Sequence, residues 1–210
     1  MTEQSTITVN GRGVLHVTPD ITRLEIGISQ TYATYEKAFA ASKQNTSLLG
    51  GIVEGSHLSP SYVKTLRFDI TESAARPGAY DMIQTFRIDV PIETGLSSTL
   101  LRNIARQMPG VNISIGYTLK DSHRTQLEIL SRAVEDAKEK AVVMAQAASC
   151  KLGNVVSINY DMQDNTPFAK GPQISTSATD NSADNFDITP QEIIISDEVA
   201  VTWELHNYKY

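Results

Sequence analysis

The sequence from residue 7 to residue 28 reads ITVNGRGVLHVTPDITRLEIGI. Apolar and polar residues alternate on both sides of Pro19 and Asp20, which is the period-two pattern of a half-buried β-strand. Proline and aspartate favour turns, so the stretch predicts two consecutive strands that pair as a hairpin about Pro19–Asp20. Gly11 and Gly13 are expected where the first of these strands bends.

Apolar residues at helical spacing follow in three stretches. They predict helices from Thr34 to about Val53, from Ser97 to Met108, and from Asp121 or Ser122 to about Cys150, the last of them capped by Gly153. Further alternating stretches predict strands at residues 63–70, 82–92, 111–119, 155–160 and 193–205.

The predicted order of elements is β-β-α-β-β-α-β-α-β-β, which is typical of an α+β fold. We expect a mainly antiparallel sheet covered by helices on one side. Residues 1–210 are expected to form a single domain, long enough to bury a core without disulfides or metals.

Residues 161–190 differ from the rest, because they are rich in Asp, Ser, Thr and Asn and poor in large apolar side chains. A stretch of this kind predicts a polar loop or arm. The run from Asp180 to Asp187 begins like a calcium-binding loop, but Asn185 stands where a glycine is expected and Glu192 comes one position too late. We expect an acidic, solvated loop here, with weak cation binding as the alternative.

The chain of 210 residues has 18 basic and 24 acidic residues and a net charge of -6, which argues against nucleic acid as a partner. Its single cysteine, Cys150, excludes an internal disulfide and is expected to be a small core or boundary residue.

No apolar run reaches the roughly 20 residues of a membrane span. The first residues lack the pattern of a secretory signal. A cytoplasmic location is expected for the sequence as written, and a periplasmic or extracellular one if the sequence is a trimmed form.

Candidate catalytic residues are few. The four histidines, His16, His57, His123 and His206, are dispersed and have no metal-ligand spacing. Asp20 is the best single acid, but an aspartate after proline most often serves a turn. The sequence has no nucleophile elbow, phosphate loop or dinucleotide fingerprint. We therefore assign no catalytic, cofactor-binding or metal-binding residue, predict no cofactor, and expect that the protein is not an enzyme.

Two stretches carry a resemblance to a known family. Gly11, Gly13, Pro19 and Asp20 match its start, and Ala133 to Val156 matches its passage from helix to strand. The matching positions in that passage are Ala137, Lys140, Ala141, Ala145, Leu152 and Gly153. From about Ile7 to Leu205 the chain resembles the SIMPL-domain family, a mostly bacterial group that includes a periplasmic immunogenic antigen.

The resemblance implies an α+β domain that associates into closed, hollow oligomers and is loosely linked to envelope or oxidative stress. It implies no agreed catalytic residues. The chain departs from the family pattern in two ways: it shows no export signal, and it has Pro190–Gln191 where relatives often have Pro-Gly before the last strand.

The leading functional hypothesis is a non-enzymatic, homo-oligomeric assembly protein, related to stress and without nucleic acid or membrane span. The alternative is a module that binds a small ligand or cation, with residues 161–190 folding over the site. A hydrolase is a distant third hypothesis, since it would need two carboxylates or histidines in one pocket.

Overall fold

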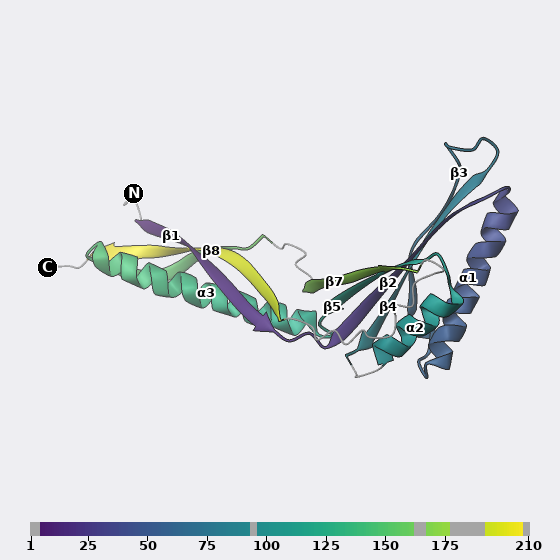
Figure 1. Ribbon diagram of the computed structural model, residues 1–210. Helices are drawn as coiled ribbons and strands as arrows, with labels where there is room; N and C mark the ends of the chain where they lie inside the picture. Colours follow the sequence, from purple (N-terminus) through teal and green to yellow (C-terminus); the bar gives the residue numbers. More distant parts are fainter. Residues whose placement is uncertain (1–4, 93–95, 162–166, 177–191, 208–210) are drawn as a thin grey trace. The chain divides into compact units, whose positions relative to one another are not determined.

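The computed structural model describes residues 5–92, 96–161, 167–176 and 192–207. The chain forms two compact units. Unit 1 comprises Met1–Thr18, Lys120–Pro167 and Glu192–Tyr210, and unit 2 comprises Pro19–Leu119 and Phe168–Gln191. The described elements follow the order β-β-α-β-β-α-β-α-β-β-β with antiparallel sheets and three α-helices, so the predicted α+β class is confirmed (Figure 1).

Unit 1 is a three-stranded sheet with one long helix along it (Figure 1). The strand order is β1-β8-β6, with β1 at Thr6–Val17, β8 at Ile193–Asn207 and β6 at Cys150–Asn159. Helix α3, Ser122–Ala147, packs on the face formed by alternate residues of β1 and β8. The core contains these buried residues: Val9, Ala133, Ala137, Ala141, Val199, Val201 and Trp203.

Gly11 and Gly13 lie where β1 meets the backbone of α3. A Cβ atom at Gly11 would be 2.0 Å from the carbonyl oxygen of Ala133, and one at Gly13 would be 2.1 Å from that of Ile129. Strand β1 keeps its register with β8 from Thr6 to Val17 without interruption. The two glycines therefore permit a close helix–strand approach, rather than a break in the pairing of the strand.

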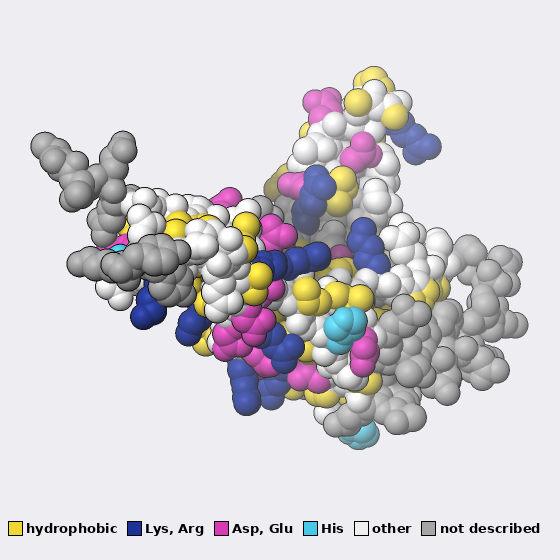
Figure 2. Space-filling model, turned by 90° about the vertical axis from the view of Figure 1, so that its left-hand side faces the viewer, with side chains coloured by type: hydrophobic (Ala, Val, Ile, Leu, Met, Phe, Trp, Pro, Cys, Tyr) yellow, Lys and Arg dark blue, Asp and Glu magenta, His cyan; other side chains and the backbone are white. Residues whose placement is uncertain are grey.

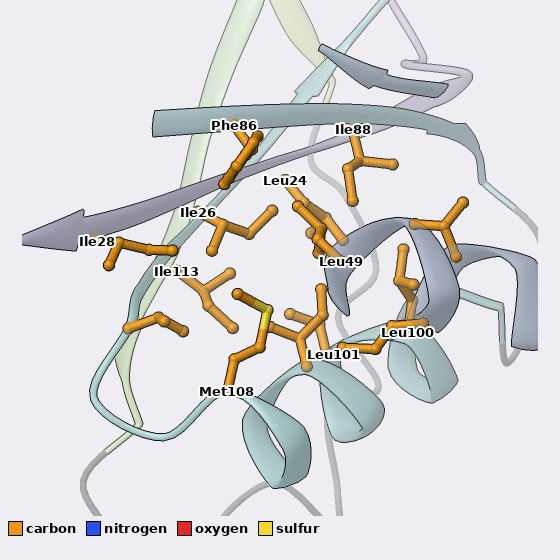
Figure 3. Packing of buried hydrophobic residues seen from close by; sticks show 14 of the residues in the cluster. Leu24, Ile26, Ile28, Leu49, Phe86, Ile88, Leu100, Leu101, Met108 and Ile113 are labelled. Atoms are coloured by element: carbon orange, nitrogen blue, oxygen red, sulfur yellow. The ribbon is translucent and has the colours of Figure 1, made fainter. Parts of the chain in front are cut away.

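Unit 2 is a five-stranded sheet in the order β3-β4-β2-β5-β7. Its elements are β2 (Ile21–Tyr32), α1 (Tyr35–Gly55), a short 3-10 turn (Pro60–Tyr62), β3 (Val63–Glu72), β4 (Tyr80–Pro91), α2 (Leu96–Gln107), β5 (Asn112–Thr118) and β7 (Phe168–Ser175). Large apolar side chains of the sheet meet those of α1 and α2, as Phe86, Leu24, Leu49 and Leu100 show in Figure 3. The hydrophobic effect of burying these side chains is the main stabilising term in unit 2.

The predicted hairpin is wrong, because β1 and β2 belong to different sheets. Strand β1 pairs with β8, whereas β2 pairs with β4 and β5. Pro19 is buried, and the backbone of Asp20 joins two strands of unit 2: its N–H donates to the carbonyl of Thr118 (3.2 Å), and its carbonyl accepts from the N–H of Ile92 (2.9 Å). The turn residues therefore begin a new sheet instead of reversing the first strand onto itself.

The polar segment 161–190 contains a strand that the sequence did not predict. Phe168–Ser175 forms β7 and pairs with β5, with a register shift between Ser114 and Gly116. Next to β7, the buried Thr176 accepts a hydrogen bond at Oγ1 from the N–H of Val111 (3.0 Å). Residues 162–166 and 177–191, including the run Asp180–Asp187 and Pro190–Gln191, lie outside the described residues.

Gly153 is not the cap of α3, contrary to the prediction. The helix ends at Ala147, and the residue with a positive φ (56°) just after the helix is Ser149. Gly153 lies in β6, where an added Cβ would be 2.5 Å from Nε2 of His206. Cys150, the first residue of β6, is half-buried, in keeping with a boundary position.

Candidate functional site

The histidines and Asp20 do not assemble a catalytic or metal centre. His16 and His206 are exposed and lie near Glu192 (3.6 Å) and Glu204 (3.5 Å), respectively. Among residues 5–92, 96–161, 167–176 and 192–207, no three His, Cys, Asp or Glu side chains are placed to hold a metal ion. Asp20 is exposed at the start of unit 2, where its backbone is bonded as described above.

The outer edge of β1 is bonded by charged side chains of α3. Asp136 accepts a hydrogen bond from the backbone N–H of Arg12 (2.7 Å). One helical turn away on either side, Lys140 donates to the carbonyl of Asn10 (3.5 Å) and Arg132 donates to that of Val14 (3.4 Å). The three residues lie one turn apart along α3, and their side chains occupy the edge of the strand.

Asp136 is the centre of this arrangement. Its carboxylate also accepts from Nζ of Lys140 at 2.7 Å. The hydrogen bonds from Lys140 and from the backbone of Arg12 lower the pKa of Asp136 below its usual range. The charged form is therefore the one that bonds the β1 edge at neutral pH.

The opposite edge of the unit 1 sheet has a different character. Strand β6 is last in the order β1-β8-β6, and no other described strand pairs with its outer side. Val155, Val156 and Ile158 are each more than half exposed. The β6–β8 pairing shifts register around Val155. Unit 1 thus has one edge covered by side chains and one edge that presents apolar side chains to solvent.

Tyr160 and Asp197 form a polar pair at the end of β6. The phenol of Tyr160 donates to Oδ2 of Asp197 at 2.7 Å, while Oδ1 accepts from the N–H of Glu198 at 2.9 Å. The bond to Asp197 is the main reason why the pKa of Tyr160 is raised. Since both oxygens of this buried carboxylate have partners, the pair is a structural tie between β6 and β8.

The sheet of unit 2 carries an ion-pair network on the face away from α1 and α2. Arg23 makes two hydrogen bonds with Asp89, at 2.8 and 2.9 Å, and this pairing raises the pKa of Arg23. Phe168 of β7 lies against Gly116. The guanidinium carbon of Arg23 is 5.9 Å from the centroid of the Phe168 ring.

The same face of unit 2 has a polar hollow of about 460 Å³ next to β7. Its lining includes Glu25, Asn112 and Gln173, together with Ser114 and Ser175. Part of the segment predicted as an arm therefore helps to line a hollow in the sheet.

A second depression, of about 550 Å³, lies between α1 and the strands β3 and β4 of unit 2, and we call it the α1–β3 groove. Phe39 and Lys43 line it from the helix, Phe68 from β3, and the buried Gln84 from β4. Sequence reasoning missed this groove. A signal was nevertheless present, because Gln84 interrupts an otherwise apolar row formed by Met82, Phe86, Ile88 and Val90.

Acidic and basic side chains are interspersed on the face shown in Figure 2, with hydrophobic side chains among them. No helix in the described part of the chain combines the length and the apolar character that a membrane-spanning helix needs.

Comparison with known proteins agrees with the resemblance noted in the sequence. The SIMPL family model, described as a protein of unknown function (DUF541), matches residues 7–203, which include most of both units. Comparison with curated proteins gives no significant match. The chain therefore belongs to the SIMPL family.

Proposed function

We propose that this protein is a non-enzymatic, homo-oligomeric assembly protein whose subunits join through strand β6 of unit 1. The observation that carries the proposal is the difference between the two edges of the unit 1 sheet. Side chains of α3 bond the β1 edge, whereas the β6 edge presents Val155, Val156 and Ile158 to solvent.

An open strand edge is a template for pairing with another chain. Soluble proteins usually protect such edges with charged side chains, yet the run from Val155 to Ile158 contains no charge. A second copy of the chain is the partner that this edge fits, because two identical edges can pair antiparallel about a two-fold axis. The resemblance to a family of closed oligomers supports the same partner.

Gel filtration with light scattering at high micromolar concentration tests the proposal. We expect a discrete oligomer for the wild type and monomers for Ile158→Lys, because the lysine would place a charge in the joined edge. Val143→Lys is the matched control, since Val143 is a similarly exposed aliphatic residue on α3. Circular dichroism would verify that both variants are folded. A strictly monomeric wild type, or equal dissociation of both variants, would contradict the proposal.

The proposal extends to a role in envelope or oxidative stress, which the family resemblance supports. A bacterial strain that lacks the protein is expected to grow more slowly than its parent under peroxide or detergent. Wild-type protein should restore growth, and the Ile158→Lys variant should not. Equal growth of the deletion strain and its parent under both stresses would contradict this extension.

Small-ligand binding in the polar hollow beside β7 is a second candidate function. The observation that favours it is that Gln173 and Ser175, from the segment predicted to fold over a site, line this hollow together with Glu25. Calorimetry against calcium and a panel of polar metabolites tests it. Saturable heat that Gln173→Ala abolishes would support the candidate, and the absence of both heat and a thermal shift would reject it.

A further inference from the structure

The α1–β3 groove of unit 2 contains a buried polar atom that has no partner in the described part of the protein. Gln84 is only 4% exposed, and its Nε2 donates to the carbonyl of Ser42 (3.3 Å) and to Oγ1 of Thr46 (3.2 Å). Its Oε1 accepts no hydrogen bond from any described group. A buried acceptor in this state is destabilising unless something else bonds it.

The orientation of this amide is fixed by its surroundings. The backbone carbonyl of Ser42 can only accept a hydrogen bond, so the nitrogen of the Gln84 amide must be the atom that faces it. Rotating the amide would bring two acceptors together. Oε1 is therefore the atom left without a bond, and a ligand that satisfies it must supply an N–H or O–H donor.

A bulge in β3 places an aromatic ring beside Gln84. Thr65 lies opposite Phe86, but the register shifts before Arg67, so that Phe68 lies opposite Gln84. Without the shift Phe68 would be paired with Ile83 and would point to the other face of the sheet. Bulges of this kind commonly redirect side chains at binding sites.

Phe68 faces a second ring across the groove. The centroids of Phe39 and Phe68 are 6.4 Å apart, with an angle of 51° between the ring planes, and both rings are substantially exposed. Tyr35 also stacks on Phe39, with the two ring centroids 6.2 Å apart. Exposed aromatic side chains held in a row offer flat apolar surface on which a planar ring can pack.

Lys43 adds a positive charge to the same place. Its Nζ lies 4.7 Å from the ring centroid of Phe39 and lines the groove. Among the described residues, its ammonium forms no ion pair with a carboxylate. The groove thus combines an unsatisfied acceptor, aromatic walls and a cation.

We propose that the α1–β3 groove binds a small planar heteroaromatic acid that carries a ring N–H. The N–H donates to Oε1 of Gln84, the ring packs on Phe39 and Phe68, and the carboxylate pairs with Lys43. The site lies in unit 2, so it is independent of the assembly edge proposed in unit 1.

Titration of the full chain with indoleacetate, followed by calorimetry and ligand-observed NMR, tests the proposal. Two analogues dissect the recognition without changing the protein: the N-methyl form of indoleacetate lacks the donor, and skatole lacks the carboxylate. We expect saturable binding of indoleacetate and about tenfold weaker binding of each analogue, because each loses one polar interaction.

Lys43→Gln should weaken indoleacetate binding about as much as removal of the carboxylate does, and should leave skatole binding unchanged. Lys37→Gln, a change to another exposed lysine of α1, is the matched control and should bind all three compounds like the wild type. Phe68→Ala should weaken all three.

Three outcomes would overturn the proposal. They are the absence of saturable indoleacetate binding, equal binding of the N-methyl analogue, and binding that neither Lys43→Gln nor Phe68→Ala changes. The first result would mean that the groove does not take a ligand of this class. Because none of these measurements depends on oligomer mass, failure here is distinguishable from failure of the proposed assembly function.

Discussion

In unit 1, helix α3 meets its sheet mainly through alanines, with its backbone against two glycines, whereas in unit 2 helices α1 and α2 meet theirs through leucine, isoleucine, methionine and phenylalanine. The buried residues of α3 are one isoleucine and four alanines. Three of its larger apolar residues, Leu127, Val143 and Met144, are more than half exposed. Close approach of backbones therefore dominates unit 1, and burial of large side chains dominates unit 2.

This contrast in packing determines which substitutions destabilise each unit. A core of large side chains loses most stability when atoms are removed, because a cavity remains. An interface of small residues loses most stability when atoms are added, because the backbone has no room to move aside. The two units should therefore respond in opposite ways to substitutions that shrink or enlarge a side chain.

Phe86→Ala should give the largest loss of stability. Phe86 is completely buried in the unit 2 core, where Figure 3 shows it on the sheet side, so its truncation should lower the free energy of unfolding by about 4 kcal/mol. Phe68→Ala, at a ring that is substantially exposed, is the control and should lose much less. Denaturant unfolding measures both, and equal losses would contradict the account of unit 2.

Gly11→Ala should be the next most destabilising change, although it adds one methyl group. The new Cβ would overlap the backbone of α3 at Ala133, and we expect a loss of about 3 kcal/mol in unit 1. Gly51→Ala is the control, because a Cβ there meets nothing within 4 Å and alanine favours the helix by about 1 kcal/mol. A Gly11→Ala variant as stable as the wild type would show that the close approach is unimportant.

Tyr160→Phe should have an intermediate effect in unit 1. It removes the hydrogen bond to the buried carboxylate of Asp197 and leaves one oxygen without its partner. We expect a loss of about 2 kcal/mol in the free energy of unfolding. The exposed Tyr62→Phe is the control and should be close to neutral; a neutral Tyr160→Phe would mean that water replaces the phenol.

Asp136→Asn should give the smallest effect, visible mainly as a change in pH dependence. The pKa of Asp136 is lowered in the folded protein, so the stabilisation is present above the unfolded value near 4 and is lost as the pH falls through the folded pKa. The variant should therefore lose less stability than the wild type between about pH 5 and pH 3. Thermal unfolding across this range measures it, and parallel curves for the two proteins would count against the β1 contacts.

Periodicity was sufficient to predict the three helices and most strands. The helix predicted from Ser97 to Met108 is observed as α2 at Leu96–Gln107, and α1 begins next to its predicted start, with Thr34 as its N-cap. Local patterns report which face of an element is apolar, and in these elements one face meets a core.

Pairing partners could not be predicted in the same way. Strand β1 pairs with β8, from the far end of the chain, and no local pattern distinguishes that partner from the adjacent β2. In α3 the buried residues are Ile129 and four alanines, and not Leu127 and Met144, because the backbone of α3 lies directly against Gly11 and Gly13. Strand β7 was missed because Gly171 and Pro172 interrupt a short, mostly polar segment.

The candidate sites depend on this non-local arrangement. The α1–β3 groove requires the register shift in β3 that brings Phe68 opposite Gln84. The contrast between the β1 and β6 edges requires knowledge of which strand is bonded by Asp136, Lys140 and Arg132. Side-chain type alone therefore offered a signal at Gln84 that was not used, and it could not have revealed the partners of that residue.

Hydrogen exchange at low and high protein concentration is the most direct test of the proposed assembly through β6. We expect that backbone amides of β6 around Val155 to Ile158 become more protected as concentration rises, while amides of β1 around Arg12 do not change. Exchange at β6 that is the same at every concentration, or protection that appears at β1 instead, would contradict it.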